Sequence, residues 1–102
     1  MHEITTCIDR SITLTGNTVV HASGTIEGDL TVPANTRLDL QGTVDGDLIV
    51  EQGGTAVVRG TILGTLFNEG GQVEVCRGAA VAAVRDASEA KTQIAPGALV
   101  AN

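Results

Sequence analysis

The sequence has almost no aromatic side chains: its 102 residues include one Phe and neither Trp nor Tyr. Modules that bind single-stranded nucleic acid use aromatic side chains as stacking platforms, and a formal net charge of −6 repels phosphate. We therefore expect no nucleic-acid partner. The chain is nevertheless 42% hydrophobic, which is enough for a folded core, and that core must be aliphatic.

A long apolar run is also missing. Residues 1–6 have neither the basic start nor the apolar stretch of a signal peptide, and no stretch approaches the ~20 apolar residues that span a bilayer. We expect a cytoplasmic protein with no membrane segment. Its two cysteines, Cys7 and Cys76, are expected to remain free, because the repeat described below places them three layers apart, on the order of 14 Å. A disulfide needs Cα atoms within about 7 Å.

Residues suited to catalysis are scarce. Enzymes built on hexapeptide β-helices use a His base, and metal-dependent ones need several converging His ligands, but the only histidines are His2 and His21. We expect His2 in a frayed end and His21 at an ordinary surface corner. Neither a Gly-x-x-x-x-Gly-Lys-[Ser/Thr] nor a Gly-x-Gly-x-x-Gly motif occurs. These features predict no enzyme, no cofactor and no metal site.

The sequence does contain an internal repeat of 18 residues, which opens alike at Gly24, Gly42 and Gly60. Three apolar columns follow from it. The first is Ile8, Ile26, Val44, Ile62, Ala80 and Ala98; the second is Ile12, Leu30, Leu48, Leu66 and Val84; the third is Ala22, Leu40, Val58, Cys76 and Ile94. Within each repeat apolar and polar residues alternate, which is the period of β structure.

Stacked repeats of this kind predict an all-β, single-stranded parallel β-helix of triangular rungs, with strands of neighbouring rungs about 4.8 Å apart. We expect one domain over residues 1–102, with rungs at 6–23, 24–41, 42–59, 60–77 and 78–95 and a partial rung at 96–102. The inward residues are expected to be Ile26, Leu30, Val32, Leu40, Val44, Leu48, Val50, Val58, Ile62 and Leu66.

Two points stay open at this stage. Apolar residues also recur every six residues, a spacing shared with left-handed β-helices of the hexapeptide acyltransferase type, so the period does not fix the handedness. The Ala-rich segment 79–91 could form a short α-helix. We favour a fifth rung there, with a looped-out corner near 86–89, because Ile94 and Ala98 fall 18 residues after Cys76 and Ala80.

The segment Gly24 to Val75 resembles the bactofilins, a family of bacterial polymer-forming scaffold proteins. The resemblance rests on the openings Gly-x-[Ile/Val]-x-Gly-Asp-Leu at Gly24 and Gly42, their variant at Gly60, and the segment 94–100, which is similar to a rung start of that family. The resemblance implies a right-handed β-helix that stacks end to end into filaments without nucleotide, as a cytoskeletal element.

The predicted coil offers two candidate interaction sites. Its ends expose apolar edges that favour self-assembly, and the residues expected there are Ile8, Ile12, Leu14, Ile94, Leu99 and Val100. One outer face gathers the carboxylates of Asp9, Glu27, Asp29, Asp45 and Asp47. The favoured function is therefore a self-assembling scaffold. The alternative is a small acidic binding module, of the immunity or inhibitor type, that docks a basic protein partner on the carboxylate face.

Overall fold

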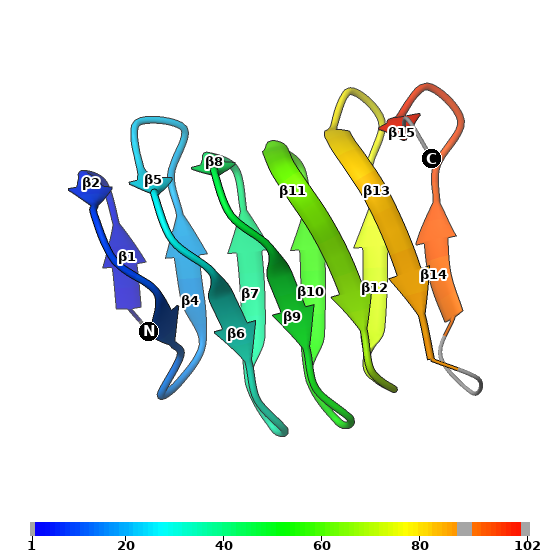
Figure 1. Ribbon diagram of the computed structural model, residues 1–102, viewed down its shortest axis with the longest axis horizontal. Coiled ribbons are helices and arrows are strands. Elements are labelled where there is room, and N and C mark those ends of the chain that lie inside the picture. The colour runs from blue at the N-terminus through cyan, green and yellow to red at the C-terminus, as the bar shows by residue number, and fades with distance from the viewer. Residues whose placement is uncertain (1, 88–90, 101–102) are drawn as a thin grey trace.

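The computed structural model describes residues 2–87 and 91–100, and within these ranges the chain forms parallel strands and no helix. The strands belong to two sheets that face each other across an aliphatic core (Figure 1). The first sheet contains β1 (His2–Ile4), β4 (Thr18–Val20), β7 (Arg37–Leu40), β10 (Thr55–Val58), β12 (Gln72–Val75) and β14 (Lys91–Ile94).

The second sheet contains the remaining strands. The short strands form two neighbouring rows, and the longest strands extend across both rows. They are β2 (Cys7–Ile8), β3 (Ile12–Thr13), β5 (Thr25–Ile26), β6 (Leu30–Val32), β8 (Thr43–Val44), β9 (Leu48–Val50), β11 (Thr61–Asn68), β13 (Ala80–Asp86) and β15 (Leu99–Val100). The structure is thus a β-helix, as the repeat predicts.

The coil is right-handed. In Figure 1 the chain advances from left to right, the strands of the second sheet run downward in front, and the paler strands of the first sheet run upward behind them. This sense of winding along the axis defines a right-handed coil and excludes the left-handed hexapeptide arrangement. Within the segment 79–91, residues 80–86 continue the coil as β13 and residue 91 begins β14, so the described part is strand and not helix, and part of the expected looped-out corner lies outside the described residues.

The predicted inward positions form the core. All ten are at most 1% exposed, and the column through Leu30, Leu48 and Leu66 pairs rung on rung at the 18-residue spacing. Three strands make each early rung, and the two that belong to the second sheet are continuous in β11 and again in β13. The corner at Gly64 lies within β11, where the register against β13 is irregular, and the Thr65 N–H there still bonds to Asp47 Oδ1 of the preceding rung.

Corner lengths vary, and this corrects the third predicted column. Val20 pairs with Leu40, 20 residues later, and Val58 pairs with Val75, 17 residues later. The predicted members Ala22 and Cys76 are therefore wrong: Ala22 is exposed at a corner and Cys76 is half-buried just beyond β12. In the rung that contains Val20, the corner before Thr18 is short and the corner after Val20 is long. The two differences cancel, so the second sheet keeps the 18-residue period while the third column is displaced.

The first predicted column is shifted in its last members. Ile62 pairs with Val81, 19 residues later, and Val81 pairs with Val100. The inward positions assigned to Ala80 and Ala98 therefore belong to Val81 and Val100, although Ala98 still packs against the core from a corner. The corner between Val75 and Val81 is two residues longer than the corner between Val58 and Ile62, and because Val75 follows Val58 by only 17 residues, the net shift of the column is one residue.

Asn68 is a polar residue in an inward position, 1% exposed, where the preceding rungs have valine. Its Oδ1 accepts hydrogen bonds from the N–H groups of Gly70 and Gly71 at 3.2 and 2.9 Å, and its Nδ2 donates to Thr92 Oγ1 at 3.2 Å. The corner that follows Asn68 is one residue shorter than the equivalent corner of the preceding rung. The Asn68 side chain therefore closes this tighter turn and satisfies its own buried amide.

Candidate functional site

The N-terminal end of the coil is formed by β1, β2 and β3, each of which pairs on one side only within the described residues. Ile8 and Ile12 are half-buried, point toward the core and lack a covering rung, while Leu14 is 6% exposed. Leu14, which the sequence analysis placed on the exposed apolar edge with Ile8 and Ile12, is instead buried in the core. Ile4 was missed: it extends the apolar end into β1, where the sequence predicts fraying and the structure pairs His2 with Thr18.

At the C-terminal end, Ile94 continues the column through Val75 and is 46% exposed, and Val100 continues the column through Val81. Leu99 does not belong to this end face. It pairs with Ala80 on the outer side of the coil and is 69% exposed. The one-residue shift described above turns Leu99 outward and Val100 inward.

Leu99 instead borders a shallow apolar groove beside the C-terminal end. The groove has a volume of about 450 Å³, and Leu63 on its rim is 58% exposed. Its other lining residues include Thr61, Ala80, Ala82 and Val100. The most exposed large apolar side chains of the described residues, Leu63, Leu99 and Ile94, thus all lie in the C-terminal half of the coil.

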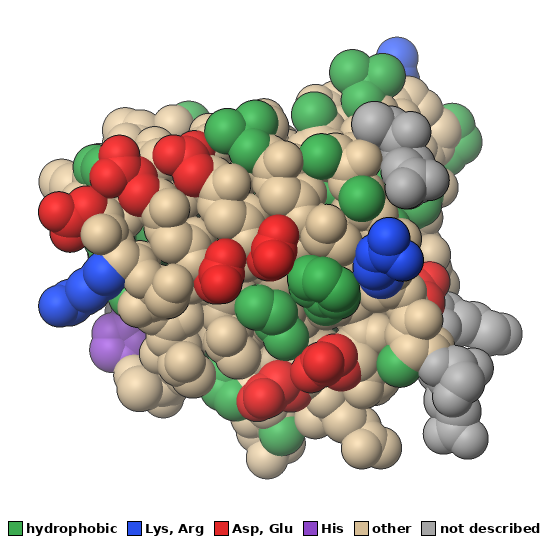
Figure 2. Space-filling view, viewed as in Figure 1, with side chains coloured by type: hydrophobic (Ala, Val, Ile, Leu, Met, Phe, Trp, Pro, Cys, Tyr) green, Lys and Arg blue, Asp and Glu red, His purple; other side chains and the backbone are tan. Residues whose placement is uncertain are grey.

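The predicted carboxylate face divides into two columns. Asp9, Glu27 and Asp45 are exposed and follow one another at the 18-residue spacing. Figure 2 shows acidic side chains gathered over the N-terminal strands on this side of the molecule. This column is free to meet a cation from solution.

The second column, Asp29 and Asp47, has a structural role that the sequence analysis did not anticipate. Asp29 Oδ1 accepts a hydrogen bond from the Asp47 N–H at 2.8 Å, and Asp47 Oδ1 accepts one from the Thr65 N–H at 2.8 Å. In the first rung Ser11 Oγ accepts the same bond from the Asp29 N–H at 2.9 Å. Each side chain therefore fastens its rung to the next, and Asp47 is half-buried rather than fully solvated.

The glycine before each of these positions makes the ladder possible. A Cβ on Gly46 would overlap Asp29 Oδ1, and a Cβ on Gly64 would overlap Asp47 Oδ1. The repeated Gly-Asp pair is thus a packing unit: the glycine leaves room for the carboxylate of the preceding rung, and the aspartate reaches the following one. The pair could have been recognised from the repeat, but its purpose depends on corner geometry that the sequence does not show.

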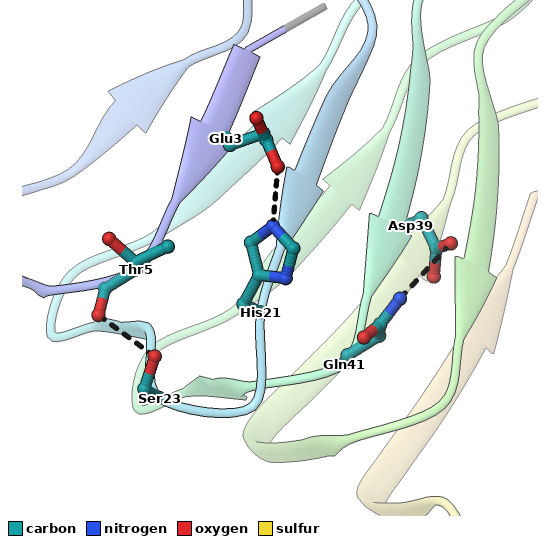
Figure 3. A network of polar contacts seen from close by, with 6 residues as sticks. All are labelled: Glu3, Thr5, His21, Ser23, Asp39 and Gln41. Carbon is teal, nitrogen blue, oxygen red and sulfur yellow. Dashed lines mark hydrogen bonds and ion pairs between the residues drawn. The ribbon is translucent and has the colours of Figure 1, made fainter.

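A small polar network ties β1 to the next rung (Figure 3). His21 Nε2 lies 2.8 Å from Glu3 Oε1, and Ser23 Oγ donates to the Thr5 carbonyl at 3.0 Å. His21 occupies a corner, as predicted, and its contact is with one carboxylate. No cluster of three or more metal-ligating side chains occurs among residues 2–87 and 91–100.

Both cysteines are free thiols, Cys7 exposed in the first rung and Cys76 half-buried. Desolvation raises the pKa of the Cys7 thiol, and the nearby carboxylates of Glu27, Asp9 and Asp45 raise it further by opposing a second negative charge. Cys7 is therefore a weakly activated thiol beside the exposed acidic column.

A scan against protein-family models found no match for this chain, and searches of curated proteins and of solved structures found none either. Within the described part of the chain, no helix is long and apolar enough to cross a membrane. The coil's own ends and faces are therefore the basis for assigning its function.

Proposed function

We propose that this protein is a structural scaffold that assembles end to end by stacking one coil on another, without nucleotide and without catalytic activity of its own. The observation that supports this proposal is that both ends of the described coil leave strand edges unpaired above an aliphatic interior. The likeness of its Gly-Asp repeat to that of the bactofilins supports the same function. The two free thiols favour a reducing compartment, which in this proposal is the cytoplasm.

The ends supply both the specificity and the driving force for stacking. Unpaired N–H and C=O groups of an edge strand bind another strand in register. The half-buried side chains of Ile4, Ile8 and Ile12 at one end, and of Val84 and Val100 at the other, would lose their remaining exposure. Each Å² of apolar surface removed from water contributes about 25 cal/mol.

The test uses charge placed at each end, beside a matched control on the same strand. Ile12→Lys and Ile94→Lys put an ammonium group on the two end faces, whereas Thr13→Lys and Gln93→Lys put it on the outer surface one residue away. In the single coil the lysine reaches water, so the fold is retained. Sedimentation velocity and negative-stain microscopy should show large species for the wild type and both controls, and small species for both end variants.

A single failing comparison is enough to reject the proposal. Wild-type protein that stays monomeric at high concentration, or end variants that assemble as the controls do, would contradict it. Monomeric protein would favour the acidic binding module, for which the exposed column Asp9, Glu27 and Asp45 is the supporting observation. Asp45→Asn would then weaken binding of a basic protein, while in the scaffold it leaves assembly unchanged.

A further inference from the structure

The outer face of the second sheet carries two apolar residues, Ile49 and Phe67, that are not part of the buried core. Ile49 and Phe67 pair directly on adjacent rungs, and both point away from the buried residues that flank them in β9 and β11. The same column has Thr31 before them and Arg85 after them. Phe67 is the single aromatic residue of the chain, and it lies outside an interior built from aliphatic side chains.

Carboxylates line this apolar pair on both sides. Asp29 and Asp47 stand two residues before the column, and Glu51 and Glu69 stand two residues after it. Figure 2 shows hydrophobic side chains in the middle of this face with acidic side chains on either side of them. Four residues of extended chain separate the two acidic rows, so the rows are about 13 Å apart.

We propose that this strip, defined as Ile49 and Phe67 between the rows Asp29/Asp47 and Glu51/Glu69, binds an amphipathic helix with basic flanks from another protein. Ile49 and Phe67 are each half-buried, so the strip is a partly exposed apolar surface rimmed by charge, and surfaces of this kind mark interaction sites. The partner's apolar stripe meets Ile49 and Phe67, and lysine or arginine on each side of the stripe reaches one acidic row. The proposal stands whether or not the coil assembles end to end.

The dimensions of the strip match those of a helix. A helix with its side chains is about 10–12 Å across, which places its two flanks over rows about 13 Å apart. Residues three and four apart on a helix are about 5–6 Å apart, close to the 4.8 Å between rungs. A helix lying along the coil axis can therefore set successive apolar residues over Ile49 and Phe67.

Arg85 limits the site at its C-terminal side, because its guanidinium would oppose a basic flank. The strip therefore covers the three rungs that contain Thr31, Ile49 and Phe67, about 10 Å along the axis. Two helical turns span this distance. A short basic segment is thus sufficient as a partner.

The experiment measures binding of a labelled synthetic helix by fluorescence anisotropy. The probe is a peptide of about 18 residues, long enough to form a helix, with leucine along one face and lysine on both flanks; a second peptide replaces every lysine with glutamate. The strip variant combines Ile49→Thr and Phe67→Thr, because threonine already occupies this column at Thr13 and Thr31. The charge variant combines Glu51→Gln and Glu69→Gln.

The strip variant should weaken binding of the lysine peptide at least about tenfold. The charge variant should weaken it several-fold at low salt and remove much of its salt dependence. Matched controls are Leu63→Thr, an exposed apolar residue elsewhere, and Glu74→Gln, an exposed carboxylate on the first sheet. Both controls should bind as the wild type does, and the glutamate peptide should not bind.

Two outcomes would overturn the proposal: wild-type affinity in the strip variant, and equal binding of the two peptides. If the strip variant keeps wild-type peptide affinity and also loses self-assembly, the strip binds a second copy of this chain instead. Circular dichroism of each variant verifies the fold, and the charge variant provides an independent test if the strip variant is poorly folded.

Discussion

Removal of the Asp47 carboxylate tests whether the Gly-Asp repeat holds the rungs together. Asp47 Oδ1 accepts the Thr65 N–H at 2.8 Å, from a half-buried position. Asp47→Ala removes this acceptor and leaves the Thr65 N–H without it. Asp45→Ala, two residues earlier on the same rung, removes an exposed carboxylate from the neighbouring column and is the matched control.

The expected cost follows from the type of bond and its partial exposure. A hydrogen bond to a charged group contributes about 1.5–3 kcal/mol when buried. Because water reaches the half-buried Asp47, we expect a loss of about 1–2 kcal/mol in the free energy of unfolding for Asp47→Ala. In a domain of this size that lowers the Tm by about 5–10 °C. Asp47→Asn keeps an oxygen acceptor and should lose less than about 1 kcal/mol.

The assay is urea denaturation followed by circular dichroism, at low protein concentration so that assembly does not add to stability. Asp45→Ala should stay within about 0.5 kcal/mol of the wild type. Equal stabilities for Asp45→Ala and Asp47→Ala would refute the ladder. The carboxylates of both columns would then be simple surface charges.

Two further predictions concern the interior and the first-rung thiol. Val44→Asp buries an unpaired charge at a position with 0% exposure and should cost several kcal/mol, whereas Thr43→Asp on the outer side of the same strand should cost little; thermal melts compare the two, and equal melting temperatures would contradict the register. The pKa of the Cys7 thiol is raised in the folded protein, so the Cys7 thiolate forms at a higher pH there than in the unfolded chain. Any stability that this group contributes is therefore lost as the pH rises above the ordinary thiol pKa. Iodoacetamide alkylation of Cys7, in a variant whose other cysteine is Ser, should need a more alkaline pH than a free thiol, and Glu27→Gln should move that pH down; an unchanged profile would show that the carboxylates do not act on it.

The sequence predicted the β-helix because the inward columns repeat where corner lengths are constant. Ile26, Val44 and Ile62 each precede the next inward leucine by four residues, so a fixed period of 18 aligned them correctly. The same fixed period wrongly assigned Cys76 to an inward column and Leu99 to the end face. The alternation of apolar residues does not reveal a corner that has gained or lost a residue. The carboxylate ladder was beyond reach for another reason: the alternation shows that Asp29 points outward, not that its oxygen bends back to the next backbone N–H.

The unequal corners also determine where this fold can accept new sequence. In the first four rungs the spacing across the Gly-Asp corner is constant, because a carboxylate of one rung occupies the space that a longer loop or a Cβ in the next would need. The corners between the two sheets already differ in length by up to two residues while the columns above and below remain paired. During divergence, a recognition loop could therefore be gained at a corner such as 51–54 without disturbing the rod. The corners between the two sheets can therefore vary in length and sequence as partners change, whereas the Gly-Asp corner is constrained by its hydrogen bonds and close packing.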